Sequence, residues 1–224
     1  MAHAATDDGP SQSQYVHAMG PELGFLCHLL RDDLDWLRAK WKEHAELFEK
    51  GQKRIDLLNR AASNFFYFLH KVFFEDAMLH LCRLTDRRQM GDRKSLTVMA
   101  LADLISDGAL KASVQTKAED AQKTCEFART WRDRRLAHTD LVTLRQENAL
   151  SLPEVNTADI YSGIKSIGAV LRMVEDHYGL PHTLLGPDPW GAESLVNYLE
   201  RADRAIDEER RSWTELAKGA ATNS

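Results

Sequence analysis

The stretch TWRDRRLAHTD, residues 130–140, places Arg132 six residues before His138. Histidine titrates near neutral pH, so it can accept or donate a proton during a reaction. Arginine keeps its charge and binds phosphate oxygens through a fork of N–H groups. Asp133, the neighbour of Arg132, can orient either side chain. These residue types suit phosphodiester cleavage, in which protons move while negative charge builds up around phosphorus.

The spacing alone is a weak signal, because a chain of 224 residues with 18 Arg and 9 His contains about 0.7 such pairs by chance. Arg38 and His44 have the same separation. That pair lies in the middle of a predicted helix among charged neighbours, which indicates a solvated face. Arg132 differs because an aspartate follows it and because it comes near the end of a helix whose body is predicted to be buried.

Composition narrows the class of protein. Hydrophobic residues make up 43% and charged residues 28%, with only 12 Gly and 6 Pro, which favours a globular helical chain. The net charge of -5 excludes extensive coating of nucleic acid, so any nucleic-acid contact is expected to be local. We predict a cytoplasmic protein with reduced thiols, because there is no secretory signal, no membrane-spanning run and no CxxC motif. The three cysteines are Cys27, Cys82 and Cys125.

Hydrophobic periodicity predicts an all-α bundle of about six helices. Residues 1–20 are expected to form a disordered tail, 21–178 the bundle, 179–217 a linker and a C-terminal helix packed on the bundle, and 218–224 a second tail. The predicted helices run from Pro21 to about Gly51, then over 55–84, 96–105, from 114 into the motif, 157–178 and 193–213. The aromatic segment 65–74 is expected to be core, and Thr157 is a candidate helix N-cap.

At the motif the sequence resembles the HEPN superfamily, whose signature is an arginine, a polar residue and a histidine after a short spacer, as in RDRRLAHTD. The upstream order is similar to its abortive-infection (AbiU-like) branch. An aromatic helix ends in LCRLTD, and a basic loop and a short helix around KSLTVMAL then precede the motif helix. The resemblance covers about residues 21–178.

This resemblance implies a metal-independent endoribonuclease without a cofactor, built as a homodimer and acting in phage defence or as the toxin of a toxin–antitoxin pair. Arg132 and His138 would be the catalytic pair, supported by Asp133. The expected partners are RNA, a second copy of the chain and a cognate antitoxin, and no membrane. Four further arginines are candidate RNA-binding residues: Arg134 and Arg135 in the motif, and Arg87 and Arg88 in the basic loop.

Helix geometry constrains the catalytic pair. Positions six apart differ by about 240° around a helix and about 9 Å along it, so Arg132 and His138 cannot share one face of a continuous helix. Either the helix ends near Leu136, or the working site combines residues of two chains. Asp140 stands where a toxin branch silenced by nucleotidyl transfer has a tyrosine, so that modification is not expected at this position.

Two other readings stay open. The chain could be a non-catalytic HEPN-like dimeric module that binds RNA or protein, or a plain helical interaction protein. In the second case the motif is a charged helix end with a structural histidine. The position of Arg132 and His138 in the folded chain distinguishes these readings.

Overall fold

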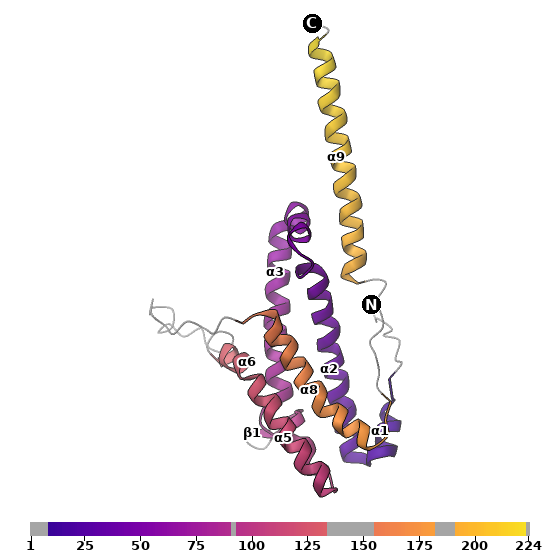
Figure 1. Cartoon of the computed structure of the whole chain (residues 1–224), viewed down its shortest axis with the longest axis vertical. Helices are drawn as coiled ribbons and strands as arrows, with labels where there is room; N and C mark the ends of the chain where they lie inside the picture. Colours follow the sequence, from indigo (N-terminus) through magenta and orange to yellow (C-terminus); the bar gives the residue numbers. More distant parts are fainter. Residues whose placement is uncertain (1–8, 91–92, 134–154, 182–190, 223–224) are drawn as a thin grey trace, which may run out of the picture. The chain divides into compact units, whose positions relative to one another are not determined.

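A computed structural model describes residues 9–90, 93–133, 155–181 and 191–222. These ranges are almost entirely helical (Figure 1), which confirms the predicted all-α class. The elements are α1 (Gln12–Met19), α2 (Pro21–Phe48), α3 (Gln52–Thr85), β1 (Gln89–Met90), β2 (Arg93–Lys94), the 3-10 turn η1 (Val98–Ala100), α4 (Leu101–Leu104), α5 (Gly108–Thr124), α6 (Glu126–Trp131), α8 (Thr157–His177) and α9 (Ala192–Thr222). No helix in this part of the chain is both long and apolar enough to cross a membrane.

The described ranges hold eight α-helices rather than the six predicted. One extra helix arises because the predicted motif helix is interrupted at Cys125, whose backbone (φ -93°, ψ 8°) separates α5 from α6. The basic segment predicted as a plain loop contains an antiparallel hairpin, in which Gln89 pairs with Lys94. The N-cap of α8 is Asn156 and not Thr157, because the Asn156 side chain accepts from the backbone of Asp159.

The second extra helix is α1, which occupies Gln12–Met19 of the segment predicted as a disordered tail over 1–20; residues 1–8 lie outside the described residues. Ser11 and Gln14 form a capping box: each side chain accepts a hydrogen bond from the backbone N–H of the other residue. Tyr15 on this helix is 1% exposed. An N-terminal segment that is capped and buries an aromatic side chain is part of the folded unit.

The chain divides into two compact units, one of residues 1–39 and 74–185 and the other of 40–73 and 186–224. Two of the three boundaries fall inside α2 and α3, so each of these helices contributes a segment to both units. The sequence predicted one bundle over 21–178 instead. The C-terminal helix α9 belongs to the second unit.

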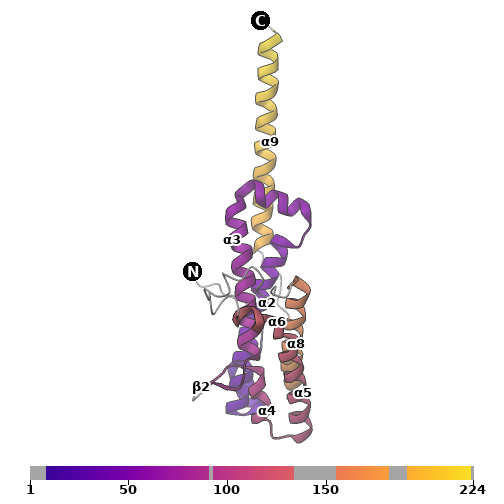
Figure 2. The ribbon, with the colours of Figure 1, turned by 90° about the vertical axis from the view of Figure 1, so that its left-hand side faces the viewer.

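In the first unit, α5 and α8 lie side by side (Figures 1 and 2). Small side chains allow this approach. A Cβ atom at Gly163 of α8 would lie 3.1 Å from the Cys125 sulfur and 3.0 Å from a methyl of Leu81, so α8 packs closely on its neighbours. The predicted buried face of the motif helix is confirmed by its members Val114, Ala118, Ala121, Cys125 and Ala128.

The second unit has its own apolar core, formed by the end of α2, the start of α3 and the start of α9. Its buried members are Leu47, Leu57, Leu58, Phe66, Ala192 and Val196. The aromatic segment of α3 is only partly core, contrary to the prediction, because α3 packs here through one face. Phe66 points into the core, whereas Phe65, Tyr67, Phe68 and Val72 are exposed.

Candidate functional site

The candidate site lies in the first unit, where the end of α3 meets the end of α6. The carbonyl oxygen of Thr85, the last residue of α3, accepts hydrogen bonds from Gln122 (3.0 Å) and Arg129 (3.1 Å). Thr97 donates to the carbonyls of Leu84 (3.1 Å) and Asp86 (2.8 Å). These bonds satisfy carbonyl groups that a helix end leaves open. They also fix the backbone of Asp86 just beyond α3.

Arg132 reaches this position from the end of α6. Its neighbour Trp131 packs edge-to-face on Phe74 of α3, with ring centroids 5.4 Å apart. The Arg132 Nη1 donates to both carboxylate oxygens of Asp86, at 3.1 and 3.0 Å, and its Nε donates to Asp133 at 2.9 Å. A predicted catalytic arginine is therefore held between two carboxylates, Asp133 at its own helix end and Asp86 just beyond the end of α3.

The charges around Arg132 are balanced. Burial by itself would lower the pKa of its guanidinium, but the hydrogen bonds and charges of Asp133 and Asp86 outweigh burial and raise this pKa. Arg129 adds a second cation, because its Nη2 lies 3.5 Å from Asp86. The raised pKa keeps the Arg132 guanidinium charged. Its side chain is 28% exposed, so it is also partly open to solvent. The bonds to these two carboxylates come from its Nε and Nη1 groups, and a guanidinium also has N–H groups on Nη2 that could donate to a phosphate.

The other predicted site residues have different positions. Arg88 pairs with Asp103 at 2.6 Å on the surface, and Arg87 is exposed in the segment that follows α3. In the structure the side chains of Arg132 and Asp133 are in contact. Arg87 and Arg88 are the next two residues of the chain after Asp86. Arg134, Arg135 and His138 lie outside the described residues.

Arg38 and His44, which have the same spacing as Arg132 and His138, are not placed beside each other in one such site. Arg38 pairs with Asp35 at 2.8 Å in the first unit. His44 belongs to the second unit, is 1% exposed and stacks on Trp41 with ring centroids 4.1 Å apart. Burial, with a contribution from the charge of His70, lowers the pKa of His44 to about 4. The predicted solvated face is wrong for His44, which is a core side chain.

Thiol and metal chemistry find little support in the described part of the chain. Cys27, Cys82 and Cys125 are free and buried, and burial raises the pKa values of their thiols to about 12, 11 and 12. These thiols are therefore protonated at neutral pH and poor nucleophiles. Within the described ranges no group of three or more His, Cys, Asp or Glu side chains could hold a metal ion.

Comparison with models of known protein families identifies the family of the chain. The HEPN_AbiU2 family model, described as AbiU2, matches residues 21–189. The chain belongs to the AbiU2 family of HEPN domains. This confirms the resemblance predicted from the motif and from the order of elements around it. No curated protein and no solved structure gave a match.

Two residues of the candidate site in this AbiU2-family chain, Asp86 and Arg129, were not predicted from the sequence. Asp86 stands 46 residues before Arg132, so no spacing rule connects them. The available signal was the LCRLTD segment, whose last residue is Asp86. Arg129 lies one helical turn before Arg132 and so shares its face of α6.

Proposed function

We propose that this AbiU2-family chain is a metal-independent endoribonuclease acting in prokaryotic defence or in a toxin–antitoxin system. The observation that supports this best is the fixed placement of Arg132. Asp86 and Asp133 hold a permanently charged and partly exposed guanidinium at a helix end, directly before the segment that contains His138.

Each residue has a role in RNA cleavage. The 2′-hydroxyl of RNA is an internal nucleophile, so the protein must move protons and stabilise a phosphorane. His138 would take the 2′-hydroxyl proton or give one to the leaving 5′-oxygen. Arg132 would bind the phosphorane oxygens. Asp86 and Asp133 would keep Arg132 oriented, while Arg87, Arg88, Arg134 and Arg135 would hold the RNA backbone.

A twofold dimer would complete the site. One histidine cannot be acid and base in the same step, and Arg132 and His138 do not share a face of a continuous helix. Two copies of the chain would supply two histidines around one scissile phosphate. Mixing wild-type chains with an excess of His138→Ala chains should lower the activity per wild-type chain, because a mixed dimer holds one histidine and not two. If the activity per wild-type chain stays constant, each chain carries a complete site.

A second candidate is a non-catalytic dimeric module that binds RNA or protein. The ion pairs of Arg132 favour a non-catalytic role, because two carboxylates already neutralise the guanidinium and would weaken its stabilisation of a phosphorane.

Cleavage assays separate these candidates. Wild-type protein should cut single-stranded RNA in EDTA, and His138→Ala should be inactive while keeping its fold and its mass in solution. His177→Ala, which changes an exposed histidine at the end of α8, should cut like wild type. A wild-type protein that binds RNA but never cuts it would support the second candidate.

A further inference from the structure

Helix α3 carries large apolar side chains on two sides within the second unit. Phe66 is buried in the core of this unit, and Leu69 and Phe73 pack against the same core. Four large side chains of the same stretch are exposed: Phe65 (59%), Tyr67 (58%), Phe68 (64%) and Val72 (61%). Packing on one side of the helix therefore leaves the rings on the other side without a function, and a contiguous exposed apolar patch marks an interaction site.

The exposed side chains and the polar residues between them form one surface. We call it the α3 aromatic patch, and its members are Asn64, Phe65, Tyr67, Phe68, Lys71 and Val72. At 100° per residue, Phe65 and Phe68 lie about 60° apart around the helix, and Tyr67 lies about 100° from Phe68. Asn64 and Lys71 occupy the positions between Tyr67 and Phe68, whose ring centroids are 5.6 Å apart. The Lys71 ammonium lies over the Tyr67 ring, 5.4 Å from its centroid.

The charge around the patch is positive although the whole chain is negative. Residues 50–73 contain five basic residues and one acidic residue, which lies outside the patch, whereas the chain has a net charge of -5. Two of the basic side chains are paired with carboxylates, Lys50 with Glu46 at 2.9 Å and Arg60 with Asp203 at 2.6 Å. Because the patch itself has no carboxylate, a polyanion can approach its rings without repulsion from that surface.

We propose that the α3 aromatic patch is a platform on which unpaired bases of single-stranded RNA stack. Every base has a flat π-face, and proteins that hold single strands combine aromatic side chains with positive surroundings. Asn64 and Lys71 can donate hydrogen bonds to base edges between the rings. A duplex keeps its bases stacked on each other, so the platform should select single strands and loops.

A protein surface or a membrane fits the patch less well. The centre of a protein interface is depleted of charged residues, whereas Lys71 lies between two rings of this patch. A helix that binds a lipid surface presents a broad apolar face with its polar residues on the opposite side, whereas the opposite side of α3 here packs on the core through Phe66 and Leu69. A single strand uses rings, donors and positive surroundings together.

The platform is separate from the candidate nuclease site. Its residues belong to the second unit, whereas Asp86, Arg132 and Asp133 belong to the first. The inference concerns binding and not cleavage, so it stands if the chain binds RNA without cutting it. Stacking releases no counterions, so the platform adds affinity with little change in the salt dependence of binding.

The first test locates the contact by crosslinking. Full-length His138→Ala protein, used so that the RNA stays intact, is irradiated with a single-stranded oligoribonucleotide that carries 5-iodouridine, a base that crosslinks to side chains in contact with it. Trypsin cleaves after Arg60 and Lys71, so most of the patch lies in one peptide, residues 61–71. We expect crosslinked RNA on this peptide. Crosslinks confined to other peptides would overturn the proposal.

The second test measures affinity by fluorescence anisotropy with a single strand of about eight nucleotides. Phe65→Ala with Phe68→Ala, made in the His138→Ala chain, should raise the dissociation constant by at least about tenfold. The same change should leave binding of a duplex unchanged. Phe65→Leu with Phe68→Leu keeps apolar side chains but removes both rings, so it should also bind the single strand weakly. Tyr67→Phe keeps the ring and should bind normally.

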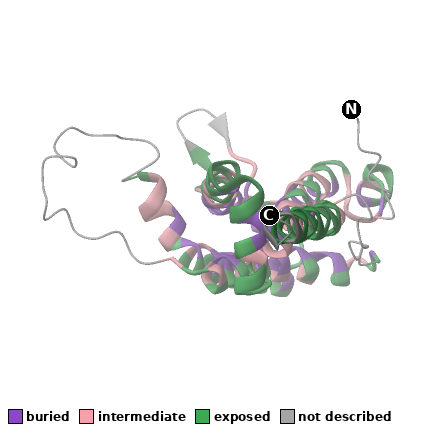
Figure 3. Ribbon diagram, turned by 90° about the horizontal axis from the view of Figure 1, so that it is seen from above, coloured by how far each residue is buried: buried purple, intermediate pink, exposed green. Residues whose placement is uncertain are grey.

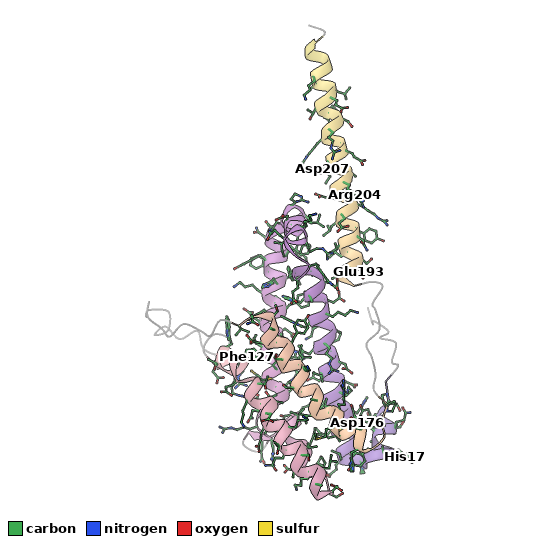
Figure 4. All side chains as sticks on the ribbon, viewed as in Figure 1. His17, Phe127, Asp176, Glu193, Arg204 and Asp207 are labelled. Atoms are coloured by element: carbon green, nitrogen blue, oxygen red, sulfur yellow. The ribbon has the colours of Figure 1, made fainter. Side chains whose placement is uncertain are left out.

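The control removes two exposed rings from other elements, Phe25 of α2 and Trp213 of α9. The described residues of α9 beyond Asp203 are exposed (Figure 3). Arg204 and Asp207, which are labelled in Figure 4, mark this part of the helix. Phe25→Ala with Trp213→Ala should bind the single strand as tightly as the parent chain.

Circular dichroism and molar mass accompany each affinity. A ring variant with intact helices and the affinity of its parent would overturn the proposal, as would a parent chain that binds no single-stranded RNA. A lower molar mass of the ring variants would also overturn it, because the patch would then be an interface between copies. Cleavage by the wild type with unchanged binding in the ring variants would refute the platform and not the nuclease, whereas binding through the patch without cleavage would do the reverse.

Discussion

The salt bridge between Arg132 and Asp86 is the residue-scale feature on which the candidate site depends. Asp86→Ala removes the carboxylate that receives two hydrogen bonds from Arg132. A misplaced catalytic group loses about a hundredfold in rate, so RNA cleavage should fall by about tenfold to a hundredfold. Asp203→Ala is the matched control, because it breaks the exposed pair with Arg60 in the second unit. Its effect should be about twofold or less. Equal losses in both variants would show that Asp86 does not position Arg132.

The lowered pKa of the buried His44 predicts how the free energy of unfolding changes as the pH falls. The pKa of His44 is about 4 in the folded chain because the ring is buried, against 6.5 ordinarily. The unfolded chain therefore binds this proton at higher pH than the folded one. The stabilisation is complete above pH 6.5 and is lost as the pH falls toward 4, by about 3 kcal/mol.

The measurement is the free energy of unfolding at several pH values. His44→Phe keeps a ring against Trp41 and cannot be protonated, so its stability should fall less between pH 6.5 and 4. His177→Gln, at an exposed position, should keep the wild-type slope. The buried environment of His44 would be contradicted by identical slopes in wild type and His44→Phe.

Part of the candidate site was predictable from the sequence, residue by residue. Arg132 and Asp133 came from the motif, because the types of neighbouring residues are visible in the chain. The Asp86 partner was not accessible, since only the meeting of the ends of α3 and α6 brings it to Arg132. The burial of His44 was missed because charged neighbours on α2 gave the appearance of a solvated face.

At the scale of elements, the docking of α1 on α2 depends on Gly24. A Cβ atom at this position would overlap the carbonyl oxygen of Tyr15, and backbone cannot move as a side chain can. Gly24→Ala should lower the free energy of unfolding by about 1–3 kcal/mol. Gly108→Ala is the control, because nothing lies within 4 Å of its Cβ. Its stability should be unchanged or higher by up to about 1 kcal/mol.

Hydrogen exchange distinguishes the local effect from a global one. Amides of α1 should lose protection in Gly24→Ala and keep it in Gly108→Ala. Equal protection of α1 in all three proteins would contradict the close contact.

Long periodic helices were predictable as elements, whereas α1 and the break in the motif helix were not. The spacing Ser11 to Gln14 is a capping-box pattern, so a signal for α1 was present in the sequence. It was missed because the surrounding segment is polar. No glycine or proline lies at the break at Cys125, so no residue there predicts the end of a helix.

At the scale of the whole molecule, net charge limits how RNA is held. The chain carries a net charge of -5, and the proposed contacts are Arg132 with Arg87, Arg88, Arg134 and Arg135. About five phosphate contacts on a single strand predict a slope of log K against log salt near -3.5 or shallower. Binding of RNA by His138→Ala at several salt concentrations measures this slope. A steeper slope would show that other basic surfaces take part.

The division into two units could not be predicted from the sequence, because two of its three boundaries fall inside α2 and α3. Hydrophobic periodicity continues through such positions, so it predicts the helices and not which core each segment joins. The family, in contrast, was predictable because the order of elements and the motif are both properties of the chain.

The chemistry of RNA ends tests the central claim most directly. Wild-type protein is incubated with single-stranded RNA in EDTA, and the products are analysed by mass spectrometry. Attack by the 2′-hydroxyl predicts 2′,3′-cyclic phosphate and 5′-hydroxyl ends, absent from the Arg132→Ala and His138→Ala reactions. Intact RNA, 5′-phosphate ends or equal cleavage by these two variants would contradict the account.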